Sequence, residues 1–373
     1  MIKTYKVRLE PNKEQEQKLW QSAGTARWAY NFTLEKQEEN YEKEEGFIND
    51  GDLRKEITQL KKTSEFEWLN NVSAQIPKQA VKDACNAYKL FFDKKSEKPR
   101  FKSRKRSKPS FYQPCDKIKF TETKVSIEKI GYIRLSEKNR IPNGKYSNPR
   151  ITHDGLHWYV SVGVEETQSI QELTGESIGI DVGIKDLAIC SNGSTYKNIN
   201  KTSKVKKTKK RLRRLQRKVS KKYEKNKEGG RYVKTSNIIK LEKEILKLHK
   251  RLKNIRIDYI HKATTEIVKT KPSKVVIEDL NVAGMMKNKY LSKAIQEQCL
   301  YEFRRQIQYK CEWSGIELVT ADRFFPSSKL CSKCGYVNKE LKLSDRIYKC
   351  PCCGNEIDRD YQASINLSKY QSA

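Results

Sequence analysis

The sequence predicts an α+β protein with several domains, and three kinds of pattern lead to this fold class. Short runs of alternating apolar and polar residues predict strands, beginning with residues 2–9. Longer charged stretches with apolar residues three and four positions apart predict helices. Two C-x-x-C pairs near the C-terminus predict a small module built around a metal ion. A chain of 373 residues has room for two or three domains.

The charge of the chain indicates the class of partner. Lys and Arg number 78 against 46 Asp and Glu, which gives a formal net charge of +32. So large a basic excess opposes compaction by self-repulsion, and contact with phosphate groups relieves it. We therefore expect nucleic acid as the partner. A basic protein that is merely soluble is the alternative.

Cysteine usage and the absence of apolar segments bear on location. Five of the ten cysteines fall between Cys331 and Cys353, which favours a metal cluster in a reducing compartment over a disulfide framework. The N-terminus is charged from the start and shows no apolar signal region. No apolar run approaches the roughly 18 residues that a membrane span needs. We therefore expect a cytoplasmic protein without membrane contact.

The N-terminal half predicts a helical unit and a small β-barrel. Residues 11–92 carry a wide apolar stripe and charged stretches typical of helices, the last of which begins at a cap at Ser73. Residues 116–165 have the pattern of short strands separated by glycine-containing turns. The strand at residues 2–9 is expected to return to this barrel.

A basic stretch between these parts, residues 93–112, mixes cations with the rings of Phe101, Phe111 and Tyr112. Cations suit phosphates and rings suit bases, so the stretch is typical of a nucleic-acid contact. A solvated loop is the alternative. The candidate contact residues here are Arg100, Lys102, Arg104, Lys105 and Arg106.

The C-terminal half predicts buried strands and a long helical hairpin. After an apolar strand at residues 178–185, the basic run and heptad seam of residues 203–269 predict an antiparallel helix pair. A pair with such one-sided charge suits a phosphate backbone, and a solvated face is the alternative. A strand at 274–280 and one long helix at 288–313 follow. The candidate contact residues on these helices are Arg211, Arg213, Arg214, Arg217, Arg304 and Arg305.

The cysteine module has the spacing of a four-cysteine zinc site. Cys331 and Cys334 form one C-x-x-C pair, Cys350 and Cys353 form the other, and 15 residues separate the pairs. Two tight turns would each present two thiolates to one structural, tetrahedral Zn²⁺. Cys352 is an additional thiol that could compete, but the pairing of Cys350 with Cys353 preserves the spacing.

Three acidic residues stand at comparable places in this half. Asp181 interrupts an apolar strand, Glu278 closes another, and Asp360 precedes a helix that follows the cysteine module. A carboxylate in a buried strand is costly unless it is paired or bound to metal. If the three converge, two Mg²⁺ or Mn²⁺ ions would relieve their repulsion, as in two-metal phosphodiester cleavage. Neighbouring acids leave the ranking open; they are Asp186, Asp279, Asp322 and Asp358, the last of which also suits a helix cap.

Several segments closely resemble the TnpB (OrfB) family of insertion-sequence proteins. They are GIDVGIKDLAICSNG, VVIEDLNVAGM, DRFFPSSKLCSKCG, YKCPCCG and DRDYQASINL, with the opening TYKVRLEPNKEQEQKL and the stretch KPRFKSRKRSKPSF. The resemblance spans nearly the whole chain. It implies an RNase H-like (RuvC-like) α/β nuclease domain with an inserted zinc ribbon. It also implies an oligonucleotide-binding-like β-barrel wedge domain with a helical recognition insert.

The resemblance assigns each of these domains a place in the chain. The wedge barrel would comprise residues 1–10 and 93–172, and the recognition domain residues 11–92. The remaining ranges are 173–325 and 356–373 for the nuclease domain, 203–269 within it for the basic hairpin, and 326–355 for the zinc ribbon.

The resemblance also implies a function. Family members are metal-dependent endodeoxyribonucleases related to the type V CRISPR effectors. A transposon-derived guide RNA directs them to double-stranded DNA beside a short flanking motif, and base pairing reads the sequence. Lys78, Gln79 and Lys82 are candidates for reading the motif. We expect a monomer that acts as a ribonucleoprotein at the prokaryotic nucleoid.

The implied site residues follow by position. The catalytic and Mg²⁺-binding residues would be Asp181, Glu278 and Asp360, and the zinc ligands Cys331, Cys334, Cys350 and Cys353. The family's last motif usually reads Asp-x-Asn-Ala-Ala, whereas Gln362 and Ser364 stand here for Asn and the second Ala. Gln keeps the amide but shifts its polar contact outward by one methylene.

Other functions remain open on the sequence alone. The main alternative is a catalytically weak or inactive RNA-guided DNA-binding repressor, which the change at Gln362 favours weakly. A transposase acting directly on element ends would need a His-hydrophobic-His motif, which is not visible. A zinc-ribbon RNA-binding protein would leave the acids in buried strands unexplained.

Overall fold

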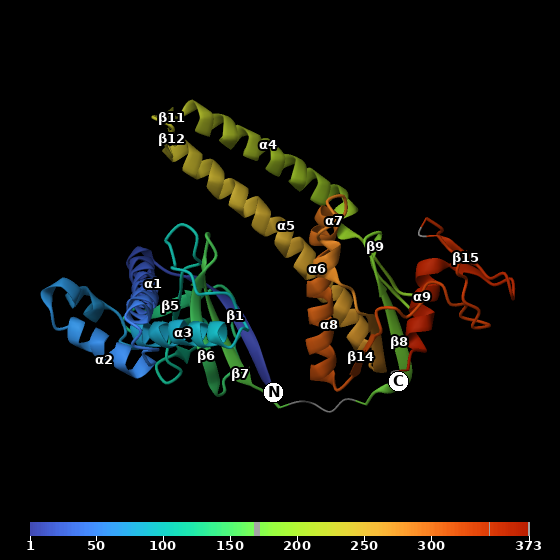
Figure 1. Ribbon diagram of the computed structural model, residues 1–373, viewed down its shortest axis with the longest axis horizontal. Coiled ribbons are helices and arrows are strands. Elements are labelled where there is room, and N and C mark those ends of the chain that lie inside the picture. Colours follow the sequence, from blue (N-terminus) through green and yellow to red (C-terminus); the bar gives the residue numbers. More distant parts are fainter. Residues whose placement is uncertain (168–171, 343, 372–373) are drawn as a thin grey trace. The chain divides into compact units, whose positions relative to one another are not determined.

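A computed structural model describes residues 1–167, 172–342 and 344–371. The chain divides into two compact units, Met1–Thr167 (unit 1) and Gln168–Ala373 (unit 2), which are described separately (Figure 1). Residues 168–171, 343, 372 and 373, which fall in the expected wedge, ribbon and nuclease ranges, lie outside the described residues. Among the helices that are described, none is long and apolar enough to cross a bilayer.

Asparagine side chains cap the first two helices of unit 1. Asn12 caps the first helix with a capping box: Gln15 N donates to Asn12 Oδ1 at 2.8 Å, and Asn12 N donates to Gln15 Oε1 at 3.1 Å. Ser73 is not the cap of the last helix, because Ala74 occupies that position without a side-chain bond. The helices are α1 (Lys13–Glu42), α2 (Asp50–Leu60), the 3₁₀ helix η1 (Ser64–Asn71) and α3 (Gln75–Phe92).

Seven strands form the sheet of unit 1, in the order β2-β6-β7-β1-β5-β4-β3. The first strand pairs with β7 along Ile2–Arg8 and with β5 at Leu9 and Glu10, as expected from a strand that returns to the sheet. No ladder among the described residues joins the edge strands β2 and β3, so closure into a barrel stays a prediction. The strands are β1 (Ile2–Glu10), β2 (Ser110–Tyr112), β3 (Lys119–Phe120), β4 (Lys124–Ile127), β5 (Gly131–Leu135), β6 (Tyr146–His153) and β7 (Trp158–Glu165).

One hydrophobic core serves both the helices and the sheet of unit 1. Leu19 and Leu34 of α1 and Val81 of α3 are fully buried in the same cluster as Val160 of the sheet. Phe111 of the basic stretch is also part of this core, so its ring is not available for stacking on a base.

The sheet of unit 2 places two adjacent parallel strands at its centre. Its order is β10-β9-β8-β13-β14, with β8, β13 and β14 parallel and β9 and β10 antiparallel. The carboxyl ends of β8 and β13 therefore meet at one edge, as parallel pairing requires. The strands are β8 (Thr174–Val182), β9 (Asp186–Cys190), β10 (Thr195–Lys197), β13 (Pro272–Glu278) and β14 (Glu317–Ala321).

The two faces of this sheet are covered differently. Ile178 and Ile180 of β8 join a core with α5 (Ser236–Lys269) and α8 (Leu300–Ser314). The opposite face of the sheet packs against α9 (Arg359–Ser368), which lies along β8 (Figure 1). This approach is so close that a Cβ on Gly179 would lie 2.1 Å from the backbone oxygen of Ser364, so only glycine fits there.

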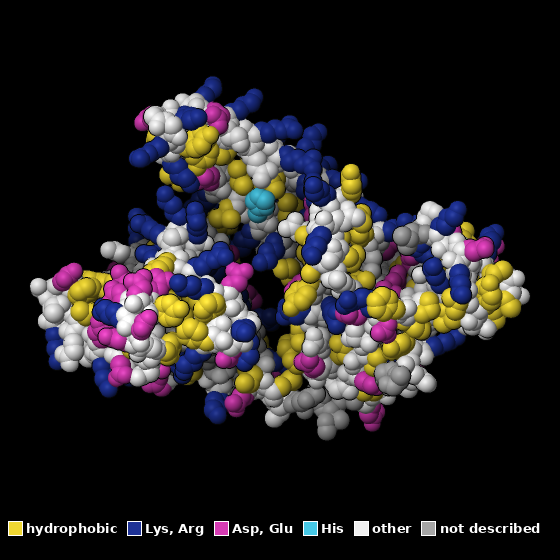
Figure 2. Space-filling view, in the orientation of Figure 1, with side chains coloured by type: hydrophobic (Ala, Val, Ile, Leu, Met, Phe, Trp, Pro, Cys, Tyr) yellow, Lys and Arg dark blue, Asp and Glu magenta, His cyan; other side chains and the backbone are white. Residues whose placement is uncertain are grey.

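The predicted helical hairpin is confirmed. Helices α4 (Ser203–Lys225) and α5 pack on each other through the predicted seam, with Leu212, Leu248 and Leu252 buried (Figure 1). The short strands β11 (Lys227–Glu228) and β12 (Arg231–Tyr232) form the turn. Lys and Arg side chains extend along the hairpin surface (Figure 2).

The prediction of a single long helix at 288–313 is wrong. The chain instead forms α6 (Val282–Met285), α7 (Ser292–Gln298) and α8. Cys299 lies between α7 and α8 and separates them, because its backbone is left-handed with φ of 56°. Apolar periodicity continues across this break, which explains why the sequence pattern predicts one helix.

Candidate active site and metal-binding ribbon

The four predicted cysteine ligands form a cluster that is ready for a metal ion. The Sγ atoms of Cys331, Cys334, Cys350 and Cys353 all lie within 4.8 Å of one another. The pairs Cys331–Cys353 and Cys334–Cys350 have Sγ–Sγ distances of 3.6 and 3.5 Å. Four sulfurs about 2.3 Å from a tetrahedral ion lie roughly 3.8 Å apart, so the spacing fits one such ion.

Local turns and a small core build this ribbon. Gly335 and Gly354 follow the two cysteine pairs with φ of 75° and 67°, the left-handed conformation that glycine adopts without strain. Tyr348 is fully buried beneath the cluster, on β15 (Ile347–Lys349), which pairs with β16 (Glu356–Asp358). Cys352 is exposed and does not belong to the cluster.

The three predicted acids come from β8, β13 and α9. Asp181 lies near the end of β8 and Glu278 ends β13, and both share a sheet face with Gly179, where α9 packs. Asp360 lies in the first turn of α9. Burial and the nearby carboxylates of Glu278 and Asp360 raise the pKa of Asp181 well above its usual value. The fold therefore gathers three carboxyl groups at one sheet edge.

Hydrogen bonds and ion pairs hold two of these carboxyls. Ser327 Oγ donates to Glu278 Oε1 at 2.5 Å, which partly offsets the rise that burial imposes on the pKa of Glu278. Arg359 Nη2 lies 3.1 Å from Asp360 Oδ1, and Arg346 Nη1 lies 3.8 Å from Asp360 Oδ2. Sequence patterns gave no signal for Ser327 or Arg346, because their contacts join separate segments, whereas Arg359 is the chain neighbour of Asp360.

The acids do not form a compact ligand cluster in this structure. Within the described ranges, the cysteine cluster is the only group of three or more His, Cys, Asp or Glu whose ligand atoms lie that close together. The carboxyls are near enough for Glu278 and Asp360 to raise the pKa of Asp181. They would have to draw closer around a cation.

Three of the four competing acids, Asp279, Asp358 and Asp322, have structural partners. Asp279 contacts both Arg304 and Arg323. Asp358 caps α9, since Asp360 N and Tyr361 N both donate to its Oδ1 at 3.0 Å. Asp322 accepts from Phe324 N at 2.7 Å in a turn, and Asp186 begins β9.

The two departures from the family motif are both buried in α9. Gln362 is fully buried, and its Oε1 accepts from Asn355 Nδ2 at 3.4 Å. The same Asn355 amide approaches Cys331 Sγ at 3.9 Å, so it links the cysteine cluster to α9. Ser364 Oγ donates to the backbone oxygen of Tyr361 at 2.6 Å and stays within its own helix.

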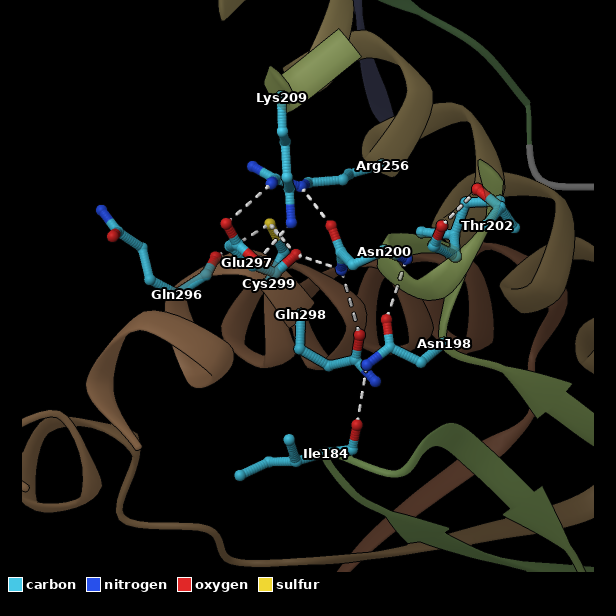
Figure 3. Close-up of polar contacts among 11 residues, drawn as sticks. Ile184, Asn198, Asn200, Thr202, Lys209, Arg256, Gln296, Glu297, Gln298 and Cys299 are labelled. Atoms are coloured by element: carbon cyan, nitrogen blue, oxygen red, sulfur yellow. Dashed lines mark hydrogen bonds and ion pairs between the residues drawn. The ribbon is translucent and has the colours of Figure 1, made fainter. Parts of the chain in front are cut away.

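A polar network fixes the base of the hairpin (Figure 3). Buried Asn200 donates to the backbone oxygen of Glu297 at 2.9 Å and accepts from Arg256 Nε at 2.8 Å. Lys209 of α4 donates to Glu297 Oε2 at 2.5 Å. The network thus joins both helices of the hairpin to the end of α7.

The same junction also holds the loop that follows Asp181. Gln298 Nε2 donates to the backbone oxygen of Gly183 at 3.0 Å. Asn198 Nδ2 donates to the oxygen of Ile184 at 2.8 Å (Figure 3). The hairpin base and the end of β8 are therefore tied to one point of the fold.

The predicted nucleic-acid residues have different environments. Lys102 is half-buried over the ring of Tyr30, 3.4 Å from its centroid, and burial lowers the pKa of Lys102. Gln79 donates to Asp83 Oδ1 at 2.8 Å and lines a small cavity with Lys102. The others on α3, α4 and the basic stretch are exposed: Lys78, Lys82, Arg100, Arg104, Lys105, Arg106, Arg211, Arg213, Arg214 and Arg217.

Three family descriptions match parts of the chain. They read "Cas12f1-like, TNB domain" for residues 301–367, "Probable transposase" for residues 159–289 and "Helix-turn-helix domain" for residues 1–46. The last range contains β1 and one long helix in this structure, not two helices joined by a turn.

Two of the relatives described below match the chain over most of its length, and a third matches about a third of it. A Streptomyces pristinaespiralis protein named "Putative RNA-guided DNA endonuclease" is 32% identical over 98% of this chain and 88% of its own length. A mimivirus protein named "TnpB-like protein L79" is 32% identical over 35% of the chain and 25% of its own length. The chain belongs to the TnpB (OrfB) family. Another relative of this TnpB chain, InsQ of Escherichia coli K12, is 29% identical over 98% of the chain and 91% of its own length.

Solved structures share the fold of this TnpB chain. The Cas12f1–sgRNA–target DNA complex gives a TM-score of 0.62 at 16% identity, over 99% of this chain and 98% of that one. The mini-RNA-guided endonuclease CRISPR-Cas_phi3 gives 0.50 at 11% identity, over 99% and 92%. At such low identity, these likenesses concern the fold alone.

Proposed function

We propose that this TnpB protein is an RNA-guided DNA endonuclease. It cleaves double-stranded DNA beside a short transposon-associated motif by two-metal-ion hydrolysis. The observation that carries the proposal is the gathering of Asp181, Glu278 and Asp360 at one sheet edge. The names of the relatives that match 98% of the chain support the proposal.

The chemistry of these three side chains suits Mg²⁺ or Mn²⁺. All three offer hard oxygen ligands, and their mutual repulsion is the strain that a divalent cation removes. Two such ions, when bound, activate the attacking water and stabilise the leaving oxygen. Ser327 orients Glu278, while Arg359 and Arg346 hold Asp360 near the edge until an ion competes for it.

The other parts of the molecule bind and position nucleic acid. The hairpin and the 93–112 stretch hold guide RNA and the RNA–DNA heteroduplex through phosphates and shape. Lys78, Gln79 and Lys82 of α3 read the flanking motif within the wedge and recognition domains. The cysteine cluster holds one structural Zn²⁺, and the protein acts as a monomeric ribonucleoprotein at the nucleoid. RNase H-like topology describes the sheet of unit 2.

The test is cleavage by the ribonucleoprotein purified with the RNA of its own locus. Mg²⁺-dependent cutting of a matched target should vanish in Asp181→Ala, while binding of RNA and target persists. Cutting that survives this change, or that needs no RNA, would reject the proposal.

The same assay tests the alternative function, an RNA-guided repressor that binds DNA without cutting it. The ion pairs on Asp360 favour this second candidate, because they oppose metal binding. A wild-type ribonucleoprotein that binds its target tightly and never cuts would establish it.

A further inference from the structure

Beside Glu278, one carboxylate holds two arginines. Arg304 Nη1 of α8 donates to Asp279 Oδ1 at 2.9 Å, and Arg323 Nη2, which follows β14, donates to Asp279 Oδ2 at 2.5 Å. These bonds hold the pKa of Asp279 below its usual value. The cluster of Arg304, Asp279 and Arg323 has one positive charge in excess, since two guanidinium groups face one carboxylate. Each guanidinium has five N–H donors and keeps several for another ligand.

These arginines line a groove that reaches the catalytic edge. The groove has a volume of about 460 Å³, and its wall includes Glu278, Arg304 and Arg323. It also includes Val182, the residue that follows Asp181. Because neighbouring strand residues face opposite sides of a sheet, Val182 faces α8 and Asp181 faces α9. The groove therefore meets the predicted acids at Glu278, where β13 ends.

An unpaired aromatic ring stands at the same wall. Tyr301 lines the groove and is 69% exposed. It lies three residues before Arg304, so both side chains project from one side of α8. A phosphate-binding group beside an exposed ring is the combination that binds a nucleotide of a single strand.

We propose that this groove is a subsite for one single-stranded DNA nucleotide next to the cleaved bond. Arg304 and Arg323 bind its phosphate, and Tyr301 stacks on its base. Asp279 is a positioning residue that aims the two guanidinium groups. A planar guanidinium held in this way loses less freedom on binding phosphate than a free side chain does. The inference rests on the proposed nuclease function.

Photo-cross-linking tests the base platform without requiring cleavage. The probe is a short oligothymidylate that carries 5-iodouracil, added to the RNA-bound Asp181→Ala protein. We expect a cross-link on Tyr301 that Tyr301→Ala removes and Tyr41→Ala, an exposed tyrosine of unit 1, leaves unchanged. Cross-links confined to other residues would overturn the subsite. A cross-link on Tyr301 in a protein whose active form never cuts would retain the subsite and reject the nuclease.

Cleavage kinetics then test the arginines through the substrate. A neutral methylphosphonate at the phosphate beside the scissile one should slow wild-type cleavage about tenfold or more. It should have no further effect in the Arg304→Ala/Arg323→Ala double variant, because the interaction is already absent. Asp279→Asn should show a smaller methylphosphonate effect than wild type. Equal slowing in all three proteins would overturn the phosphate clamp.

Discussion

The two predicted metal-binding regions of unit 2 differ in how far the protein alone assembles them. The four cysteine sulfurs lie within 4.8 Å of one another, whereas the three carboxyls form no such group. The cysteines come from two tight turns of one short segment. The acids come from β8, β13 and α9, which lie far apart in the sequence.

The difference follows from charge and from locality. Glycine turns place two thiols each at little entropic cost, and thiols can stay neutral until metal binds. Three carboxylates repel one another, and ion pairs with Arg346 and Arg359 engage Asp360 in place of a cation. A local site is built by its own turns, whereas a composite site depends on packing elsewhere and on its ions.

The largest expected effect is loss of the ribbon in Cys334→Ser. Binding of a structural zinc contributes on the order of 10 kcal/mol to folding of such modules, so the ribbon should unfold. Metal analysis should fall from one zinc per chain to none, and cleavage should vanish. RNA binding by the hairpin should persist. Equal loss of RNA binding would mean that the ribbon supports the whole unit.

Glu278→Gln should break the composite site without disturbing the ribbon. Cleavage should fall about 10³-fold, because several kcal/mol of charge stabilisation are lost and each 1.4 kcal/mol is tenfold. Zinc content should stay unchanged. The unfolding temperature in EDTA should stay the same or rise, because one repelling charge is removed. A lower unfolding temperature would contradict the repulsion between the acids.

Gly179→Ala tests whether the composite site depends on remote packing. The new methyl would lie 2.1 Å from Ser364 O, so α9 must shift, at a cost of about 3 kcal/mol. Hydrogen-exchange protection of α9 and cleavage should fall together. Gly175→Ala is the matched control in the same strand, since nothing lies within 4 Å of its added carbon. Equal behaviour of both variants would refute the packing argument.

Lys310→Met tests a pH dependence of folding stability that arises from a buried lysine and not from the three carboxyls. Burial lowers the pKa of Lys310 from 10.5 to about 8, and none of its partners, Thr264, Thr265 and His261, carries a negative charge. The unfolded chain binds more protons between about pH 8 and 10.5, so wild-type stability should rise through that window. The variant should lose this rise and gain about 2 kcal/mol at pH 7. Unfolding at pH 7 and 9.5 measures both effects.

Asn355→Ala should give the smallest effect and reveal the link between the two sites. Asn355 touches both Cys331 and Gln362, and loss of such a supporting bond typically costs 10- to 100-fold in metal affinity. We expect about tenfold weaker zinc binding and a modest fall in cleavage. Asn338→Ala, in the ribbon but with its side chain bonded to Glu340 N, is the control. A change in zinc affinity without any change in cleavage would separate the sites.

Sequence reasoning succeeded where structure follows from local pattern. The heptad seam through Leu248 and Leu252 predicted the hairpin, and the C-x-x-C spacing predicted the cysteine cluster. Buried strands that carry Asp181 and Glu278 made these acids candidates, and the parallel pairing of the two strands brings their ends together.

The rest depends on contacts that no local pattern records. The break at Cys299 is invisible because apolar periodicity continues through it. The sequence predicts that the ring of Phe111 contacts a nucleic-acid base, but the shared core of unit 1 buries this ring. Ser327 and Asn355 act through partners that tertiary packing brings to them.

Because α9 must pack onto β8, the predicted catalytic site can form only at the end of protein synthesis. Chains emerge from the ribosome at about 5–20 residues per second, and early segments fold first. The hairpin is complete well before α9, which supplies Asp360 and closes over Gly179. Under the proposed function, a nascent chain would therefore bind RNA before it can cut DNA. Products that stop short of Arg359 would occupy guide RNA as harmless competitors of the full-length enzyme.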